Sequence, residues 1–254
     1  MAGVVTQPAP LKPLAAGALV AVIAPAGPAA PATVAQVPAL YARYGLRCRL
    51  LPSCHARHAS HDFLAGDDAL RVADLHAAFA DPEVAAIHCL RGGYGCARLL
   101  PHIDRALLTA NPKPLIGYSD VTALHALLFG LGQISLHAPM PASDLLHADA
   151  GPDADALFAL LRNGLRAGAV LAPTLQRTPL KRVPGVAHGR LAGGNLSVLA
   201  SLIGTPFMPD LRDTLLFIED IGEDPYRVDR LLGQFEQAGL LAGVRGFVDR
   251  KSVV

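Results

Sequence analysis

The first half of the chain alternates short apolar runs with longer stretches in which apolar residues recur at helical spacing. The apolar runs predict β-strands at 19–24, 47–51, 84–90 and 114–117. Helices are predicted near 33–44, 67–79 and 121–131, the last because leucines recur at 124, 127, 128 and 131. Strands and helices in this order predict an α/β fold with a parallel sheet wrapped by helices, whose strand-end loops form a site.

The second half follows a different pattern. Residues 148–184 are rich in Asp, Gly, Pro and Arg and contain one predicted helix at 153–162, which is typical of a connecting region. A strand at 214–218 and a helix behind Pro225 indicate a second unit. We therefore expect an N-terminal extension at 1–16, an N-terminal α/β domain at 17–147, a connecting region at 148–184 and a smaller C-terminal domain at 185–254.

Charge and cysteine usage narrow the class of protein. The 254 residues carry a net charge of +1 and no basic run, so the sequence has no electrostatic footprint for nucleic acid. The four cysteines form no C-x-x-C pair, and we expect reduced thiols in a reducing compartment. No apolar stretch of about 20 residues predicts a membrane span.

The N-terminal apolar segment has two interpretations. Residues 14–23 follow Lys12 and precede Ala24-Pro-Ala26, a pattern that also resembles a signal peptide with a small-residue cleavage site. The same residues serve as the first buried strand and its turn. We favour the strand, and with it a cytoplasmic protein.

A group of soft and imidazole side chains precedes Phe63. Cys54, His55, His58 and His61 have a spacing that zinc ligands can adopt. The group falls in a predicted loop, apart from the other candidate chemistry, and we expect no metal site there.

The segment Gly117-Tyr-Ser-Asp120 lies between a predicted strand and a predicted helix. A serine delivered by a strand to the first turn of a helix has its hydroxyl where backbone N–H groups favour developing negative charge. Ser119 is therefore a candidate nucleophile. The alternative is that Ser119 and Asp120 only cap the helix, because both are preferred N-cap residues.

Further segments accompany this turn in a fixed order: Ile23-Ala-Pro-Ala-Gly-Pro28, Phe63-Leu-Ala-Gly-Asp-Asp68 with Arg71, Asp74 and Leu75, Leu90-Arg-Gly-Gly-Tyr-Gly95 with Ala97-Arg-Leu-Leu100, Gly193-Gly-Asn-Leu196, and Phe217-Ile-Glu-Asp-Ile-Gly-Glu223 with Pro225-Tyr-Arg and Asp229-Arg-Leu-Leu232. Together they resemble the LD-carboxypeptidases, serine peptidases that remove the terminal D-alanine from murein tetrapeptides and that include the microcin-immunity peptidases. The resemblance runs from about Leu19 to Val248.

The resemblance implies a flavodoxin-like N-terminal parallel sheet with helices on both faces and a smaller, incomplete C-terminal α/β domain. It also implies that Ser119 is the nucleophile and Glu219 the carboxylate that orients a histidine, with the backbone N–H groups of Gly93 and Asp120 as the oxyanion hole. We expect Arg91 and Gly92 to contact substrate, Arg91 through a substrate carboxylate.

The implied reaction is hydrolysis of the L-to-D peptide bond of murein tetrapeptide, or of a related peptide with a C-terminal D-residue, in peptidoglycan recycling. A peptide antibiotic is the other substrate class. No cofactor is implied, and the family suggests a homodimer.

Each segment also has a simpler interpretation. The glycines of Arg91-Gly-Gly-Tyr-Gly95 are compatible with a phosphate cradle for a mononucleotide or flavin, but their spacing fits neither a P-loop nor the dinucleotide fingerprint. By charge alone, Glu219, Asp220, Glu223 and Asp224 form a solvated acidic turn. A surface ion pair is the ordinary role of Arg91.

The implied histidine is missing from its expected place. All ten histidines lie at or before His188, upstream of Glu219. Asp249-Arg-Lys-Ser-Val-Val254 matches the translation of a widely used sequencing adapter, so we expect a reading frame truncated near Val248; an ordinary charged tail is the alternative. Greatly reduced activity is then expected, and a noncatalytic muropeptide-binding protein is the second hypothesis.

Overall fold

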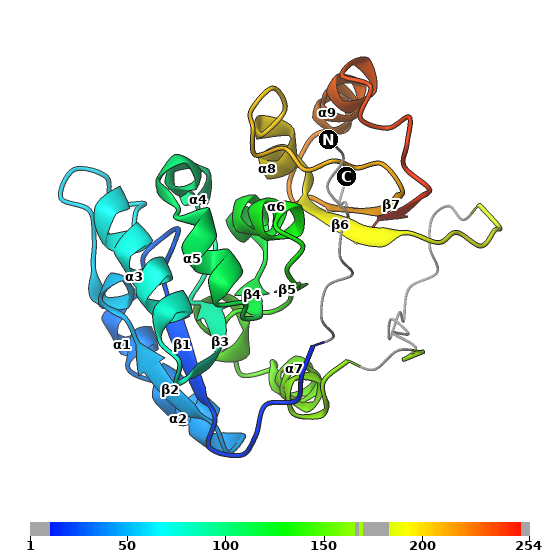
Figure 1. Cartoon of the computed structure of the whole chain (residues 1–254). Coiled ribbons are helices and arrows are strands. Elements are labelled where there is room, and N and C mark those ends of the chain that lie inside the picture. Colours follow the sequence, from blue (N-terminus) through cyan, green and yellow to red (C-terminus); the bar gives the residue numbers. More distant parts are fainter. Residues whose placement is uncertain (1–10, 166–167, 170–182, 250–254) are drawn as a thin grey trace.

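The computed structural model describes residues 11–165, 168–169 and 183–249, and Figure 1 shows two α/β units. The first unit contains a parallel sheet in the order β2-β1-β3-β4-β5. This is the flavodoxin-like order, so the predicted fold class is confirmed. The strands are β1 Leu19–Ile23, β2 Arg47–Leu50, β3 Val84–Cys89, β4 Leu115–Gly117 and β5 Ser135–His137.

Helices cover both faces of this sheet. Alternate residues of β1 divide between two cores, because successive side chains of a strand point to opposite faces. Leu19, Ala21 and Ile23 belong to one core, and Val20 and Val22 belong to the other. The helices are α1 Pro31–Val34, α2 Val37–Arg43, α3 Asp68–Ala80, α4 Cys96–Leu99, α5 Arg105–Ala110, α6 Thr122–Gly130 and α7 Gly151–Asn163.

The second unit is smaller. Strands β6 Arg190–Asn195, β7 Thr214–Glu219 and β8 Gly246–Asp249 form a parallel sheet in the order β6-β7-β8. Helices α8 Leu196–Ser201 and α9 Pro225–Gln237 follow β6 and β7. Buried residues of α8, β7 and α9 join the same hydrophobic core as α3 and α6, so the two units pack together through apolar side chains.

Two sequence predictions need correction. The single helix predicted at 33–44 is two short helices, α1 and α2, because Pro38, in the first turn of α2, has no backbone N–H to donate to the Val34 carbonyl. Strand β5 was not predicted. It has three half-buried residues, Ser-Leu-His, and forms by pairing with β4.

The N-terminal apolar segment forms a core strand. Every residue of β1 is buried, and the strand pairs with both β2 and β3. Among the described residues, no helix has the length and apolar character needed to cross a bilayer. Residues 250–254, which carry most of the adapter match, lie outside the described residues, while Asp249 is the last residue of β8 and pairs with Ile218.

Candidate active site

The turn after β4 holds Ser119 in an unusual backbone conformation. Tyr118 is extended, with φ −155°, and Ser119 has φ +61° before the chain enters a 3-10 turn at Ser119–Val121 and then α6. A left-handed conformation is uncommon for a residue with a side chain and costs roughly 1 kcal/mol or more. Gly117 lets the end of β4 pack closely against β3, since a Cβ there would lie 3.1 Å from the Cβ of Cys89. The serine is thus presented at the carboxyl end of the sheet.

The loop after β3 touches this serine, as the sequence predicted for loops that follow neighbouring strands. A Cβ added to Gly92 would lie 3.0 Å from the Cβ of Ser119 and 3.1 Å from its Oγ. Gly93, with φ +125°, packs against the backbone of Gly27, and the Gly27 N–H donates to the Gly92 carbonyl at 3.2 Å. The loop after β1 thus contacts the Arg91-Gly-Gly loop, which in turn contacts Ser119.

A buried arginine fixes the far side of these loops. Arg71 is fully buried; its Nη1 donates to the Pro25 carbonyl at 2.6 Å, and its Nη2 pairs with Asp68. Arg98 donates hydrogen bonds to the same carboxylate from Nε and Nη2, and these bonds lower the pKa of Asp68. A Cβ on Gly95 would lie 2.4 Å from Arg71 Nη1, so the glycine loop can pack against the guanidinium because Gly95 has no side chain. The sequence marked Arg71 as part of a motif but gave no sign of this role.

The carboxylate of Asp120 also ties the loops together. It is 5% exposed, and its Oδ2 accepts from the Cys96 N–H at 2.8 Å at the start of α4. The Asp120 side chain therefore has a structural role, and it is the backbone of this residue that a ligand at the Ser119 turn can contact.

The second unit contacts the start of α6 through the end of β6. The Asn195 N–H donates to Thr122 Oγ1 at 2.9 Å, and both residues are buried. A Cβ on Gly194 would lie 2.4 Å from the same oxygen, so only glycine allows this approach. Asn195 pairs in register with Glu219, the last residue of β7. The carboxyl end of the second sheet thus abuts the first turn of α6, three residues after Ser119.

The acidic turn after β7 is not uniformly solvated, contrary to what its charge alone suggested. Asp220 is 5% exposed. Its carboxylate accepts from Asn195 Nδ2 at 3.2 Å and from the N–H and hydroxyl of Ser197 at 3.1 and 2.6 Å. Asn195 in turn caps α8 by accepting from the Val198 N–H. This network, which sequence reasoning missed, fixes the turn that follows Glu219.

Three histidines lie near the ends of the first sheet. Burial lowers the pKa of both His88 and His125 to about 4, against the opposing effect of their backbone hydrogen bonds. His88 donates from Nε2 to the Pro139 carbonyl at 2.9 Å and accepts at Nδ1 from the Tyr41 hydroxyl at 2.6 Å. His125 donates from Nε2 to the Gly117 carbonyl at 2.9 Å. Both rings therefore support the sheet rather than the serine.

His137 ends β5 beside Gly117 in the register of the sheet. Its ring centroid lies 5.7 Å from that of Tyr118 and 4.8 Å from that of Phe217, on β7. The ring thus packs between the two units. Tyr118, in turn, donates its hydroxyl to Asp144 at 2.9 Å, which anchors the residue before Ser119.

Arg91 is exposed beside this site. Its Nε donates to the Gly92 carbonyl at 3.3 Å and its Nη1 to the Pro28 carbonyl at 3.4 Å, both long for hydrogen bonds. In the described part of the chain Arg91 forms no ion pair, contrary to the ordinary role suggested for it. Donors of its guanidinium remain available to a ligand.

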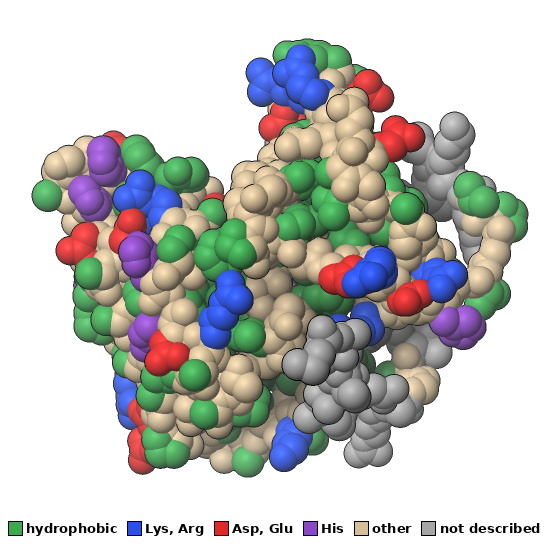
Figure 2. All heavy atoms as spheres, turned by 45° about the horizontal axis from the view of Figure 1, so that its top comes forward, with side chains coloured by type: hydrophobic (Ala, Val, Ile, Leu, Met, Phe, Trp, Pro, Cys, Tyr) green, Lys and Arg blue, Asp and Glu red, His purple; other side chains and the backbone are tan. Residues whose placement is uncertain are grey.

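The histidine group before Phe63 is split. Cys54 is buried and its Sγ donates to the Val22 carbonyl, whereas the rings of His58 and His61 stack on each other at 4.8 Å. Among the described residues, no three side chains of the metal-binding types lie close enough to hold an ion. On the face drawn in Figure 2, basic and acidic side chains are interspersed and the described atoms form no extended basic patch.

Two family models match the chain: an LD-carboxypeptidase N-terminal domain over residues 20–138 and an LD-carboxypeptidase C-terminal domain over residues 188–249. Among curated proteins, the chain is 42% identical over 190 residues to a probable murein peptide carboxypeptidase of Bacillus subtilis, which covers 74% of this chain and 58% of that protein. It is 36% identical over 182 residues to the murein tetrapeptide carboxypeptidase of Pseudomonas aeruginosa, covering 69% and 58%. The chain thus spans less than two thirds of the length of these relatives.

Solved structures give the same result. The muramoyltetrapeptide carboxypeptidase from Oxalobacter formigenes superposes with a TM-score of 0.77 at 31% identity, covering 91% of this chain and 75% of that one. An MccF-like protein from Bacillus anthracis superposes with a TM-score of 0.80 at 26% identity, covering 97% and 80%. The sequence, the fold and the arrangement of the loops agree: the chain belongs to the LD-carboxypeptidase family.

Proposed function

We propose that this chain carries the catalytic face of a serine-type carboxypeptidase that cleaves the L-to-D peptide bond of murein tetrapeptide and releases D-alanine, a step of peptidoglycan recycling. The observation that carries the proposal is the contact between the Arg91-Gly-Gly loop and the left-handed Ser119 at the carboxyl end of the sheet. The names and activities of the relatives supply the substrate class.

In this proposal Ser119 Oγ attacks the carbonyl carbon of the bond before the terminal D-residue. We propose that the carbonyl oxygen becomes an oxyanion held by the N–H groups of Gly93 and Asp120. The serine proton passes to a histidine oriented by Glu219 and then to the leaving amine, so that D-alanine departs. Water then hydrolyses the acyl ester and restores the serine.

Two of the described histidines are unsuited to act as the base of this mechanism. His88 and His125 are committed to backbone carbonyls and are neutral because of their lowered pKa. All ten histidines precede Glu219. We therefore propose that the 254 residues alone turn over slowly, since removal of a triad base costs about a million-fold in a comparable serine peptidase.

The test is D-alanine release from murein tetrapeptide, measured with and without added imidazole as an external base. We expect little release by the parent chain alone and a rise with imidazole, because in the proposed mechanism imidazole supplies the base that takes the Ser119 proton. Ser119→Ala should abolish the rise. Glu219→Gln, which keeps the shape and removes the charge, separates the role of that carboxylate.

The outcomes distinguish two functions. Serine-dependent release supports the peptidase. Saturable tetrapeptide binding by a folded chain, with no release even in imidazole, would instead support the second hypothesis, a noncatalytic muropeptide-binding protein. From the family alone we also propose a cytoplasmic homodimer, which cell fractionation and light scattering test.

A further inference from the structure

The segment between β5 and α7 contacts the ends of both strands that carry the loops of the candidate site. The Ala138 N–H donates to the Gly117 carbonyl at 3.1 Å, at the end of β4. The Ala142 N–H donates to the Leu90 carbonyl at 2.9 Å, directly after β3. We call residues 138–145 the bracing segment, because they connect the two strand ends from which the loops of the site start.

Asp144 lies in a π-helical turn of the bracing segment, Pro141–Leu145, and both oxygens of its carboxylate accept hydrogen bonds. Oδ2 accepts from the Met140 N–H at 2.8 Å, and the Asp144 N–H donates to the Met140 carbonyl at 3.0 Å, so the carboxylate is fixed relative to its own turn. Oδ1 accepts from the Tyr118 hydroxyl at 2.9 Å. The carboxylate therefore links the bracing segment to the residue before Ser119.

Ser119 lies between two residues whose side chains are held by distant segments. Before it, the Tyr118 hydroxyl is held by Asp144, and after it, the Asp120 carboxylate accepts from the Cys96 N–H at 2.8 Å. The residue between these anchors has φ +61°, a conformation that costs roughly 1 kcal/mol or more and persists only where its surroundings enforce it. Loss of the Tyr118 anchor would let Ser119 relax toward the right-handed region and change the direction of its hydroxyl.

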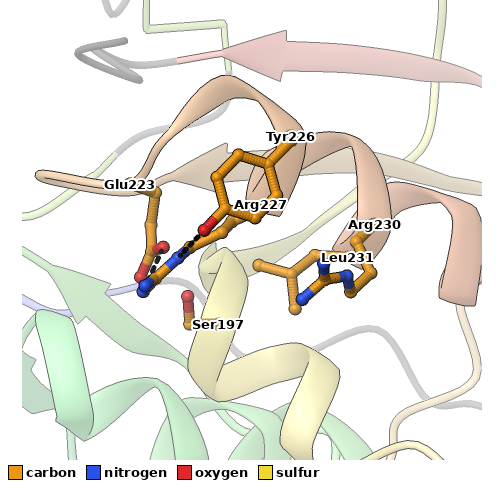
Figure 3. A pocket seen from close by; sticks show the side chains of 6 residues that line it. All are labelled: Ser197, Glu223, Tyr226, Arg227, Arg230 and Leu231. Atoms are coloured by element: carbon orange, nitrogen blue, oxygen red, sulfur yellow. Dashed lines mark hydrogen bonds and ion pairs between the residues drawn. The ribbon is translucent and has the colours of Figure 1, made fainter.

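The tyrosine hydroxyl bonds of this chain differ in what they hold together. In the pocket between α8 and α9, Figure 3 shows Arg227 between the Glu223 carboxylate and the Tyr226 hydroxyl, which accepts from Arg227 Nε at 3.2 Å. Arg227 and Tyr226 are neighbours in α9, so that bond holds no second segment in place. The Tyr118 hydroxyl, in contrast, joins residues 26 positions apart, and it can therefore fix the turn that follows β4 on another part of the fold.

We propose that Asp144 is a positioning residue for the proposed hydrolysis: through the Tyr118 hydroxyl it keeps Ser119 left-handed and its Oγ beside the Arg91-Gly-Gly loop. The inference rests on the proposed function. Asp144 has no part in the proposed proton transfers and acts only through Tyr118. Its loss should therefore slow the attack by Ser119 on bound tetrapeptide and leave the binding of tetrapeptide unchanged.

The test is imidazole-assisted D-alanine release from murein tetrapeptide, with kcat and KM measured for Asp144→Ala, Tyr118→Phe and the double variant. Each single variant should lower kcat at least about tenfold, since a small displacement of a nucleophile has a large effect on rate, and should leave KM unchanged. The double variant should be no slower than the slower single variant, because both substitutions break the same bond. Asp144→Asn can still form a hydrogen bond with the Tyr118 hydroxyl and should recover most of the rate.

The bond between Tyr44 and Asp155 is the matched control. The Tyr44 hydroxyl donates to Asp155 in α7 at 2.7 Å, so it too joins distant segments. Tyr44 lies shortly before the start of β2, at the amino end of the sheet, whereas Ser119 follows the carboxyl end of β4. Tyr44→Phe and Asp155→Ala should alter neither kcat nor KM. Urea unfolding of every variant establishes that each is folded under the assay conditions.

Unchanged kcat in Tyr118→Phe and Asp144→Ala, with serine-dependent release by the parent, would overturn the inference and leave the peptidase proposal standing. Additive losses in the double variant would overturn it too, because Asp144 would then act independently of Tyr118. If Asp144→Ala fails to fold, Tyr118→Phe, which keeps the carboxylate, decides the inference alone. Absence of serine-dependent release by the parent would remove the proposed function and the inference together.

Discussion

Gly92 and Ser119, 27 positions apart in the sequence, are so close that a single added methyl group on Gly92 would sit 3.0 Å from the serine Cβ. This approach brings the backbone of one strand-end loop against the hydroxyl of the next. The proposed mechanism uses N–H donors of this loop to hold the oxyanion, so the approach of the two loops is the contact to test.

Gly92→Ala should displace the serine. We expect the unfolding free energy to fall by about 1–3 kcal/mol through overpacking, and imidazole-assisted D-alanine release to fall at least about tenfold, because a small displacement of the nucleophile costs much more rate than stability. Urea unfolding and the release assay measure the two effects. Gly130→Ala is the control: it lies at the end of α6 with no atom within 4 Å of an added Cβ, and should be neutral or slightly stabilising. Full release by Gly92→Ala would contradict the assigned contact.

The left-handed backbone of Ser119 predicts an inverted ranking of glycine and alanine. Glycine adopts φ +61° without a Cβ penalty, so Ser119→Gly should be about 1 kcal/mol more stable to urea than Ser119→Ala. At Ser201, which is exposed and ends α8, the same pair should rank the other way, since alanine is favoured in a right-handed helix. The same ranking at both positions would show that Ser119 is not held left-handed in solution.

Thr122→Val tests the junction between the two units. The substitution keeps the shape but leaves the buried Asn195 N–H without its acceptor, and we expect a loss of about 1–3 kcal/mol in unfolding free energy. Thr109→Val, at an exposed position on α5, is the matched control and should stay within about 0.5 kcal/mol of the parent. Equal effects of the two substitutions would mean that the Thr122–Asn195 contact contributes nothing to stability.

The lowered pKa of His125 predicts a pH dependence of stability. Between its ordinary value of 6.5 and the folded value of about 4, the unfolded chain binds a proton that the folded chain does not. Unfolding free energy should therefore fall as pH falls through this window, by about 1.4 kcal/mol per pH unit for this residue.

His125→Gln removes that contribution while retaining a donor for the Gly117 carbonyl. Urea unfolding at pH 7, 6 and 5 should show a shallower decline for the variant than for the parent. A residual slope is expected because His88 has the same low pKa. Parallel declines for parent and variant would show that His125 is protonated in the folded chain.

Sequence patterns alone predicted strands β1 to β4 and helices α3 and α6 of the first unit, and the motifs that place Ser119 and the Arg91-Gly-Gly loop after two of these strands. These features are local, because periodicity, turn glycines and strand-to-helix order are written in consecutive residues. The family followed from several such motifs in one order.

Only the tertiary structure decided the rest. It made a strand of the three residues 135–137 by pairing them with β4, buried Asp220 against Ser197, and set Asn195 on Thr122, 73 positions away. It also directed His88 to the Pro139 carbonyl, far along the chain, and His125 to the Gly117 carbonyl, across the turn. Each of these outcomes depends on the side chains that surround a residue after folding, and burial by distant segments is what converts a polar side chain from a solvated group into a fixed contact.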